Sequence, residues 1–571
     1  MNTSTQRVNG QTRPIDPTGQ ADRPDVNKPE SAVNTRGPAK PPAEEGGKKP
    51  SAAVRLVALA RERYTFVMST DGRPYAVAID GPNLALPLRG RAGLRQRLSR
   101  LYTDTFVGDV ASQSALADAM TVLEGVAEDD DPVVAHLRVG HDDAGTLVID
   151  LGTADGRAVT VSAGGWHVVE RSPVLFRRSG AMAPMPTPIL IGDGLSKFHA
   201  LLNMDESTFR QLVAWLVAAW IPTIPHPVLT FKGEQGTGKS KTAQMVVNLV
   251  DPSPASKRSQ PRDIKAWSAQ AFNSWALCLD NISTIPPWFS DTLCKAVTGD
   301  GIVDRALYTD DDVVVLTFRR VLAMTTIDAG ALAGDLAERL LMLDLQLIDE
   351  ENRRTEEELD DAFEAVRPSV LGSLCDLLAT VLAVLPSIHL ATMPRMADFA
   401  RVLAAVDQVM EWNTLDDYLA TSANVAGDAL EGDQFGSAVA ALVEQAGTWT
   451  GTAAQLLEQA QPPGGVRPQN WPKDATRAGG KVKRLAPLLR SIGITVDDTQ
   501  RSRDRHRAKL LILTRTDPPD ESASAPPQDP LWPETTQPGA GHRPLTSTDA
   551  AGTLPGRAAA QRPGRVTRCG R

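Results

Sequence analysis

Apolar and polar positions follow regular patterns through the middle of the chain but not at its two ends. Residues 1–50 and 517–571 are rich in Pro, Gly and polar side chains and contain few large apolar residues. Segments of this kind cannot bury enough apolar surface to offset the entropy lost on ordering. We therefore predict a disordered tail at each end, the second of them basic, and folded domains between the tails.

The pattern over residues 51–188 predicts an α+β accessory domain. Helical periodicity covers residues 54–63, 94–102 and 113–127, and short β-rich runs cover residues 64–68 and 75–79. Four further runs, separated by turns that contain Asp and Gly, predict an antiparallel meander over residues 133–139, 146–151, 158–162 and 166–171. This stretch shows no nucleophile–base pair and no metal-ligand spacing, so we expect a scaffold or a binding module.

Longer apolar runs predict the architecture of the rest of the chain. We expect an α/β core over residues 189–347, a helical region over residues 348–433 and a last small domain over residues 434–516. The most apolar run, residues 212–224, spans about 13 residues, whereas a membrane helix needs about 20. This run is therefore expected to be a buried helix, and no membrane partner is expected.

A glycine-rich loop follows the apolar run 227–231 and precedes the helical run 242–250. It matches the P-loop pattern GxxxxGK[ST] in the strand–loop–helix context that this motif requires. Its glycines let backbone N–H groups point at phosphate oxygens, and the helix N-terminus adds its dipole. We expect Lys239 to contact the phosphates of ATP and Ser240 to bind Mg²⁺. The expected nucleotide-binding residues are Gly233, Glu234, Gln235, Gly236, Thr237, Gly238, Lys239, Ser240 and Lys241.

The apolar run 275–279 is typical of a buried parallel strand, and Asp280 follows it directly. An acid at the carboxyl end of such a strand reaches the crevice where α/β sheets bind ligands. Asp280 is therefore expected to hold Mg²⁺, as the Walker B carboxylate; the alternative is an Asp that caps the next turn. Asn281 stands where many P-loop ATPases have an acid. An amide can only orient the attacking water, which leaves slow hydrolysis or a base from elsewhere open.

Two more residues complete the candidate catalytic set of Lys239, Asp280, Asn281, Thr325 and Arg339. Thr325 ends the apolar run 320–324 and is a candidate sensor of the γ-phosphate, the alternative being an ordinary strand-end threonine. Arg339 follows a short loop and is placed to reach a nucleotide, in a neighbouring subunit, as an arginine finger. The alternative for Arg339 is a surface ion pair with Asp335.

The order of these motifs resembles that of the superfamily 3 helicases of phages and plasmids, which are ring-forming relatives of the AAA+ ATPases. The likeness rests on the block LCKAVTGDGIVDRALY at residues 293–308. The sequences DNIS after the Walker B run and DLAER at residues 335–339 are also similar to ATP-binding proteins of phages and integrated elements. The resemblance covers residues 166–345 and implies a homo-oligomeric ring with a DNA-contacting hairpin over residues 295–312. Asn281 and Thr325 depart from the helicase pattern.

The pattern over residues 434–516 predicts a winged helix that binds DNA. We expect helices over residues 437–446, 452–459 and 480–491, a strand over 449–451, and a hairpin from 494–496 and 509–513. Clusters of basic side chains suit DNA phosphates; the alternatives are a solvated loop and a patch that meets an acidic neighbouring subunit. The expected DNA-binding residues are Lys481, Lys483, Arg484, Arg501, Arg503, Arg505 and Arg507.

Composition narrows this interpretation. The formal net charge of −9 argues against a protein that coats nucleic acid with its whole surface, but it allows a local basic patch. The four cysteines lie far apart without CxxC or zinc spacing, which suits a reducing compartment. No signal peptide is visible, so we expect a cytoplasmic protein.

Together these patterns predict an ATP-hydrolysing, helicase-like motor that acts on DNA in the replication of a phage or mobile element. The alternative, favoured by Asn281, is a non-motor P-loop ATPase switch whose nucleotide state controls assembly on DNA or on a protein partner. A small-molecule kinase is disfavoured because no acceptor-site motif follows the P-loop.

Overall fold

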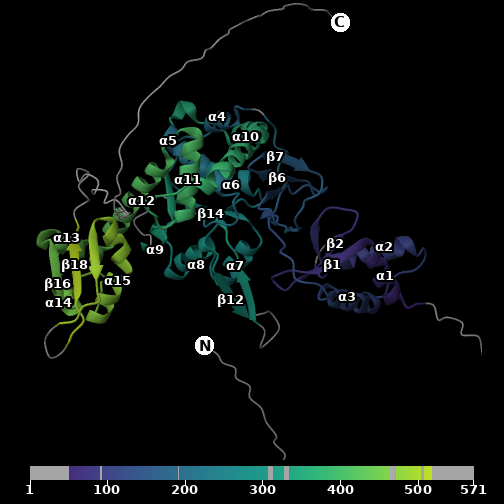
Figure 1. The fold of residues 1–571 in the computed structure, drawn as a ribbon, viewed down its shortest axis with the longest axis horizontal. Helices are drawn as coiled ribbons and strands as arrows, with labels where there is room; N and C mark the ends of the chain where they lie inside the picture. Colours follow the sequence, from purple (N-terminus) through teal and green to yellow (C-terminus); the bar gives the residue numbers. More distant parts are fainter. Residues whose placement is uncertain are drawn as a thin grey trace, which may run out of the picture.

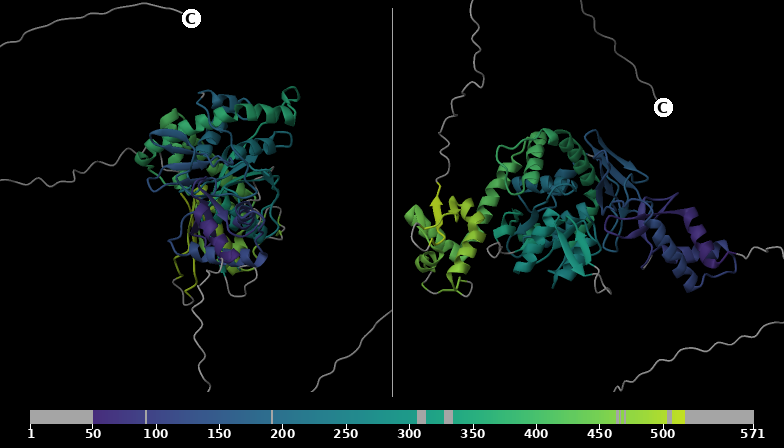
Figure 2. Two further views of the ribbon diagram at one scale, coloured as in Figure 1. Left: turned by 90° about the vertical axis from the view of Figure 1, so that its right-hand side faces the viewer. Right: turned by 60° about the horizontal axis from the view of Figure 1, so that its bottom comes forward.

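The computed structural model describes residues 50–90, 93–190, 192–305, 313–326, 334–462, 465, 467–468, 471–502 and 507–516. Apart from residue 50, both predicted tails lie outside these ranges. The described parts lie in a row (Figures 1 and 2), with an N-terminal unit at one end, an α/β core in the middle and a C-terminal unit at the other end.

The N-terminal unit packs three helices against a small sheet of order β1-β2-β3-β8. Ser51 and Ser112 cap two of the helices by accepting hydrogen bonds from backbone N–H groups, which satisfies donors that a helix start leaves free. Leu56, Leu98 and Leu123 lie in its own hydrophobic cluster. The elements are α1 (Ala52–Arg63), β1 (Tyr64–Met68), β2 (Pro74–Ala78), β3 (Leu84–Pro87), α2 (Leu94–Thr105), α3 (Gln113–Ala127) and β8 (Phe176–Arg177).

The predicted meander is present as four antiparallel strands, β4 (Val139–His141), β5 (Leu147–Asp150), β6 (Ala158–Ser162) and β7 (Gly165–Val169). The run 133–139, predicted as its first strand, contributes only Val139 to β4, while Val133 and His136 form isolated bridges to Ser69 and to Phe176 of the N-terminal sheet. The inner face of the meander belongs to the hydrophobic cluster of the α/β core, and Trp166 donates a hydrogen bond to Asp376 of the helical region. Residues 51–188 therefore contribute both to hydrophobic clusters of their own and to that of the α/β core, and the boundary predicted at residue 188 is not a break in packing.

The α/β core is a five-stranded parallel sheet of order β10-β11-β14-β9-β15. Its inner strands are buried along their length because helices cover both faces. The strands are β9 (Val228–Lys232), β10 (Lys257–Arg258), β11 (Ala276–Leu279), β14 (Val321–Thr326) and β15 (Leu340–Asp344), and the helices are α4 (Gly194–His199), α5 (Glu206–Ala218), α6 (Lys239–Val250), α7 (Ile264–Phe272), α8 (Pro287–Thr298) and α9 (Gly334–Ala337). Because the strands are parallel, their carboxyl ends meet at one edge of the sheet.

A two-stranded antiparallel hairpin, β12 (Gly301–Arg305) and β13 (Val313–Thr317), projects from this core (Figure 1). It corrects the predicted hairpin of residues 295–312, because Lys295 belongs to α8 and Gly299 ends that helix with a left-handed backbone at φ 94°. The connection between the two strands lies outside the described residues.

The helical region contains η1 (Glu350–Asn352), α10 (Glu356–Val384), η2 (Leu385–Ser387), α11 (Ala397–Met410) and α12 (Thr414–Glu431). Helix α10 crosses α4 at close range, since a Cβ atom on Gly194, the first residue of α4, would lie 2.2 Å from the carbonyl oxygen of Ser369 in α10. Among the described residues, one helical stretch, Glu356–Ser387, is long and apolar enough to cross a membrane. Its length and composition are weak evidence for a membrane-spanning helix, because 56% of its most apolar 18-residue stretch is buried inside the folded protein.

The C-terminal unit consists of α13 (Gln434–Ala446), β16 (Thr448–Gly451), α14 (Ala453–Gln459), α15 (Ala475–Ser491), β17 (Ile494–Asp497) and β18 (Leu511–Arg515). Its strands form an antiparallel sheet of order β16-β18-β17. Helix α15 begins earlier than predicted because Asp474 caps it, accepting a hydrogen bond from the N–H of Arg477. One side of α15 packs against α12 and α9, which attaches this unit to the core.

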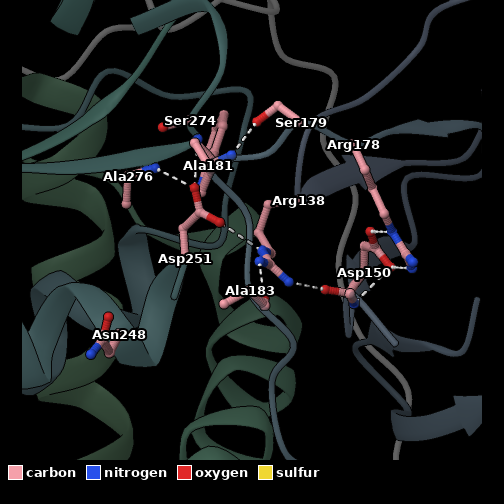
Figure 3. A network of polar contacts seen from close by, with 12 residues as sticks. Arg138, Asp150, Arg178, Ser179, Ala181, Ala183, Asn248, Asp251, Ser274 and Ala276 are labelled. Carbon is pink, nitrogen blue, oxygen red and sulfur yellow. Dashed lines mark hydrogen bonds and ion pairs between the residues drawn. The ribbon is translucent and has the colours of Figure 1, made fainter. Parts of the chain in front are cut away.

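A buried polar network joins the meander to the core (Figure 3). Arg138 is fully buried and donates from Nε to Asp251 Oδ1 at 2.8 Å, and its other nitrogens donate to backbone carbonyls of Asp150 and Ala183. The second oxygen of Asp251 accepts from the backbone N–H of Trp275 at 2.7 Å. The meander is thus tied to the first residues of β11.

Candidate nucleotide-binding site

The loop from Gly233 to Ser240 leaves the carboxyl end of β9 and enters α6. Gly233, Gly236 and Gly238 have φ angles of 153°, 93° and 80°, a backbone region that side chains disfavour. A Cβ atom on Gly233 would also lie 2.8 Å from the carbonyl oxygen of Leu345. The loop geometry therefore requires glycine at these positions, as the motif predicts.

Lys239 is the first residue of α6, and its ammonium folds back over the loop. Nζ donates to the carbonyl oxygens of Gly233 at 2.7 Å and Glu234 at 2.6 Å. Partial burial lowers the pKa of Lys239, and the negative charge of Asp280 opposes this shift. The cation thus lies against the first two residues of the loop.

Three residues predicted from separate motifs meet beneath this loop. Asp280 Oδ1 accepts hydrogen bonds from Ser240 Oγ and Thr325 Oγ1, each at 2.7 Å. The meeting follows from the sheet order, because β14 lies between β9 and β11 and carries Thr325 at its end. Thr325 is therefore more than an ordinary threonine at the end of a strand, because its hydroxyl group orients the Asp280 carboxylate.

Asn281 has a left-handed backbone with φ 58°, and its N–H donates to Thr325 Oγ1 at 2.8 Å. Asn adopts this conformation more readily than other residues with a side chain, including Glu. The local backbone therefore gives a physical reason for an amide where an acid was expected.

Two cavities adjoin the loop and share Gln235, Gly236 and Gly238 in their linings. The smaller, of about 470 Å³, is lined by Gln235, Gly236, Gly238, Lys239, Ser240, Lys241, Asn281, Thr325, Thr326 and Glu356. The larger, of about 1060 Å³, is lined by the same three loop residues, by the segment that follows α4 and by residues at and near η1 and the start of α10, among them Leu201, Leu202, Ile348, Arg353, Arg354 and Leu359. The smaller cavity thus has a mainly polar lining, and the larger has a mixed apolar and basic one.

Glu356 was not singled out from the sequence, although it contributes the carboxylate among the described side chains that line the smaller cavity. It begins α10, and an ion pair between Lys241 and Asp360 at 2.6 Å holds the start of this helix against the start of α6. The three consecutive glutamates after Thr355, a helix cap, were the available sequence signal. Nothing in their spacing indicates that the helix start lies beside the loop.

Arg339 lies at the opposite end of the sheet from the loop of its own chain. Its carbonyl oxygen accepts from the N–H of Val228, the first residue of β9. Its side chain is buried and pairs with Asp335 at 2.6 Å, and Arg395 also pairs with Asp335 at 3.3 Å. The ion pair considered as an alternative is therefore present, although its arginine is buried rather than on the surface.

The predicted basic surface of the C-terminal unit is partly neutralised. Lys481 pairs with Asp433 at 2.9 Å, and Lys483 pairs with Asp498 at 2.5 Å. Lys483 and Lys509 together lower the pKa of Asp498 to about 2. Each of the two lysines therefore has a carboxylate partner in the folded unit, and their contact with DNA stays a prediction.

The remaining predicted DNA-binding residues divide between described and undescribed positions. Arg484 is exposed on α15, while Arg501 bridges to Lys509 at the base of the hairpin and donates to the carbonyl oxygen of Arg507. Arg503 and Arg505 lie outside the described residues.

Comparison with protein families identifies two consecutive matches. A family model described as the actinomycete integrative conjugative element replication protein matches residues 195–428. A second, described as the AICE RepA C-terminal domain, matches residues 435–534. The core, the helical region and the C-terminal unit thus match the replication protein family of these elements, which agrees with the likeness to proteins of integrated elements.

Likenesses to solved structures are weaker. The apo structure of the NrS-1 C terminal region is 12% identical, with a TM-score of 0.34, over 82% of this chain and 100% of that chain. A structure of JCV Helicase with a bound small molecule is 14% identical, with a TM-score of 0.20, over 42% of this chain and 73% of that chain. TM-scores this low carry no argument about the fold. No curated protein matches the chain.

Proposed function

We propose that this chain is a cytoplasmic, helicase-like motor that binds and hydrolyses ATP and acts on DNA in the replication of an integrative conjugative element. The observation that carries the proposal is the pair of hydrogen bonds from Ser240 and Thr325 to Asp280 beneath the glycine-rich loop. The family matches support the replication role. In this proposal the core is an AAA+-like P-loop core and the C-terminal unit is a winged helix.

The loop is suited to the phosphates of ATP. Lys239 now donates to neutral backbone carbonyls, which are weaker acceptors than phosphate oxygens. Ser240 and Asp280 would hold Mg²⁺, because a hydroxyl and a carboxylate are oxygen ligands of the kind that this ion prefers. The ion would supply charge neutralisation at the phosphates, and Thr325 keeps the Asp280 carboxylate in position.

The larger cavity is suited to the base and ribose. Leu201, Leu202 and Ile348 offer apolar surface to a planar base, and the lining residues Arg353 and Arg354 add positive charge near the loop. A mainly apolar cleft with a few polar groups is the usual form of a small-molecule site.

Activation of the attacking water is assigned to Glu356. Asn281 lines the same cavity and can orient water through its amide, but it cannot accept the proton. Glu356 can accept a proton, and it already lines this cavity. The base that the Walker B strand lacks would thus come from the helical region.

Assembly into a ring would complete the site. Arg339 would act on the nucleotide of a neighbouring copy, for which its pair with Asp335 must open or reorient. DNA would be contacted by the β12–β13 hairpin of the core and by Arg484, Arg501, Arg503, Arg505 and Arg507 of the C-terminal unit.

A second candidate, a non-motor ATPase switch, is favoured by Asn281. A switch has no need for DNA to accelerate hydrolysis, whereas a motor does. The two candidates therefore differ in how ATP turnover responds to single-stranded DNA.

The test is ATP turnover by the full chain with and without single-stranded DNA, beside Lys239→Ala and the exposed-site control Lys257→Ala. For the motor we expect DNA to raise turnover in the unaltered chain and in the control, and Lys239→Ala to abolish it. Nucleotide binding without turnover at any DNA concentration would contradict the motor and support the switch.

A further inference from the structure

A third cavity, of about 560 Å³, lies where the N-terminal unit, the meander and the α/β core meet. We call it the arginine pocket. Its lining includes His136, Arg177, Phe272, Phe318, Arg319 and Arg320. Thr317, the last residue of β13, also lines this pocket. The arginine pocket therefore adjoins the base of the hairpin that projects from the core.

The three arginines of this pocket are withdrawn from water. Arg177 is 9% exposed and Arg320 is 6% exposed, and Arg319 is half-buried. The Arg177 guanidinium lies 4.0 Å from the ring centroid of Phe272 and the Arg320 guanidinium 4.9 Å from that of Phe318. Aromatic faces hold the guanidinium planes in fixed orientations.

These guanidinium groups donate to backbone carbonyls and, within the described part of the chain, form no ion pair. Arg177 donates to Phe272 at 2.7 Å, and Arg319 donates to Pro222 at 3.1 Å and Thr298 at 3.2 Å. Arg320 donates to the carbonyl of Arg319 at 2.7 Å. Nε of Arg319 is buried and, among the described residues, has no hydrogen-bond partner.

The charges of Asp71 and Asp398 act on Arg177 and Arg319, respectively, but neither carboxylate forms an ion pair with these arginines in the described part of the chain. Asp71 is the carboxylate among the described lining residues, and it pairs with Arg73 at 3.5 Å. Asp251, whose charge acts on Arg320, is paired with Arg138. His136 adds no anion, and burial lowers its pKa to about 4, so that it is neutral near pH 7.

Such an excess of buried positive charge is costly without an anion. Burial and the charge of Arg177 together lower the pKa of Arg320 to about 9. Buried charges are normally paired, because removal from water costs several kcal/mol for each ion. The planar forks of arginine match the oxygens of a phosphate group in particular.

The position of the arginine pocket in the fold indicates which kind of phosphate-bearing ligand it binds. The segment from Phe318 to Arg320 connects the hairpin to β14, the strand that carries Thr325 at its other end. A ligand held here would lie between the proposed DNA-contacting hairpin and the proposed nucleotide site. A free nucleotide already has a loop and two cavities of its own at the opposite edge of the sheet.

We propose that the arginine pocket binds a backbone phosphate of single-stranded DNA, with Arg319 as the accessible contact and Arg177 and Arg320 fixed behind it. This inference rests on the proposed action on DNA. It adds a site at the junction of three parts of the chain that neither the hairpin nor the C-terminal unit provides. DNA bound here would contact the segment that leads into β14, the strand that carries Thr325.

The test is the affinity of the full chain for fluorescein-labelled oligo(dT), measured by anisotropy across a range of salt concentrations. The variants are Arg319→Gln, Arg319→Lys and the matched control Arg100→Gln, an arginine 87% exposed on α2. Loss of one phosphate contact lowers the slope of log affinity against log salt by about 0.7, or about fivefold in affinity at 0.1 M salt. We expect this loss in Arg319→Gln, retention of most of the slope in Arg319→Lys, and no change in the control.

Thermal unfolding and ATP turnover without DNA show whether Arg319→Gln is folded. If it is folded and has the same affinity and slope as the unaltered chain, the arginine pocket is not a DNA site, while the proposed motor stands. If the unaltered chain itself does not bind oligo(dT), both proposals fail. If inorganic phosphate stabilises the unaltered chain but not Arg319→Gln, and oligo(dT) binding is equal, the pocket binds free phosphate and the DNA assignment is overturned.

Discussion

The hydroxyl groups of Ser240 and Thr325 both donate hydrogen bonds to the same oxygen of Asp280. The orientation of this carboxylate therefore depends on two hydroxyl groups. Thr325→Val keeps the shape of the side chain and removes its hydroxyl, and a hydrogen bond to a charged group contributes about 1.5–3 kcal/mol. If this hydrogen bond stabilises the transition state, its removal lowers ATP turnover by about tenfold or more, with little change in ATP affinity. Steady-state turnover and titration with a fluorescent ATP analogue measure the two quantities.

Thr230→Val is the matched control for that prediction. Thr230 is buried in β9 of the same sheet and donates to the carbonyl of Val228, away from Asp280. Equal losses of turnover in the two variants would show that the sheet, rather than the setting of Asp280, is responsible.

Glu356 allows a second prediction for a single residue. If its carboxylate activates water, Glu356→Gln lowers turnover by about 10²- to 10⁴-fold, the usual contribution of a general base, and leaves ATP binding intact. Glu357→Gln is the control, because Glu357 follows in the same helical turn but does not line the cavity. Turnover in Glu356→Gln that equals the control would remove Glu356 from the mechanism and leave Asn281 to orient water without a base.

The residues of the site differ in how far sequence could predict them. The loop and Asp280 are local, since a motif or a single apolar run identifies each of them. Thr325 joins them because β14 lies between β9 and β11, an order that no local pattern states. Glu356 and Arg319 were missed for the same reason, because packing between distant segments gives each its cavity.

At the scale of elements, the ion pair between Arg138 and Asp251 determines how the meander is attached to the core (Figure 3). Arg138→Met would leave Asp251, which is 1% exposed, without its cation. Breaking a buried pair from one side costs about 3–5 kcal/mol, which corresponds to a fall in the unfolding midpoint of roughly 5–15 °C. Thermal unfolding followed by circular dichroism measures it.

The control at this scale is Arg157→Met. Arg157 pairs with Asp155 at a similar distance, 2.8 Å, but in a partly exposed turn of the meander. An exposed pair contributes about 0–1 kcal/mol, so this variant is expected to unfold close to the unaltered midpoint. A fall in Arg138→Met no larger than in Arg157→Met would mean that apolar packing, and not the ion pair, holds the meander in place.

Elements were predicted better than their packing. The meander strands and the order helix, strand, helix, helix, hairpin in residues 434–516 follow from local periodicity and turn residues. The attachment of the meander to the core does not, because Arg138 and Asp251 are 113 residues apart in the chain. The same holds for Lys481 and Lys483, which look free in a sequence but meet Asp433 and Asp498 in the folded unit.

At the scale of the whole molecule, the two halves of the proposed active site lie apart in one chain. Arg339 lies beside the first residue of β9 and the loop follows its last, so a five-residue strand of about 16 Å separates them. The C-terminal unit continues from the core on the opposite side from the N-terminal unit (Figure 2). One copy therefore cannot bring Arg339 to its own nucleotide without disrupting the sheet, so the proposed role of Arg339 requires the neighbouring copy of the proposed ring.

A mixing experiment tests this arrangement. Lys239→Ala lacks the phosphate contact but keeps Arg339, and Arg339→Ala lacks the arginine but keeps the loop, so each alone is expected to be inactive. In an equal mixture, a complete site needs an intact loop beside an intact arginine, which gives about a quarter of the unaltered turnover if subunits assemble at random. Asp335→Asn is the companion variant, because it removes the ion-pair partner of Arg339 and leaves the arginine in place. Mixtures that stay inactive, although both variants fold and assemble, would confine Arg339 to its ion pair with Asp335 and leave each nucleotide site complete within one chain.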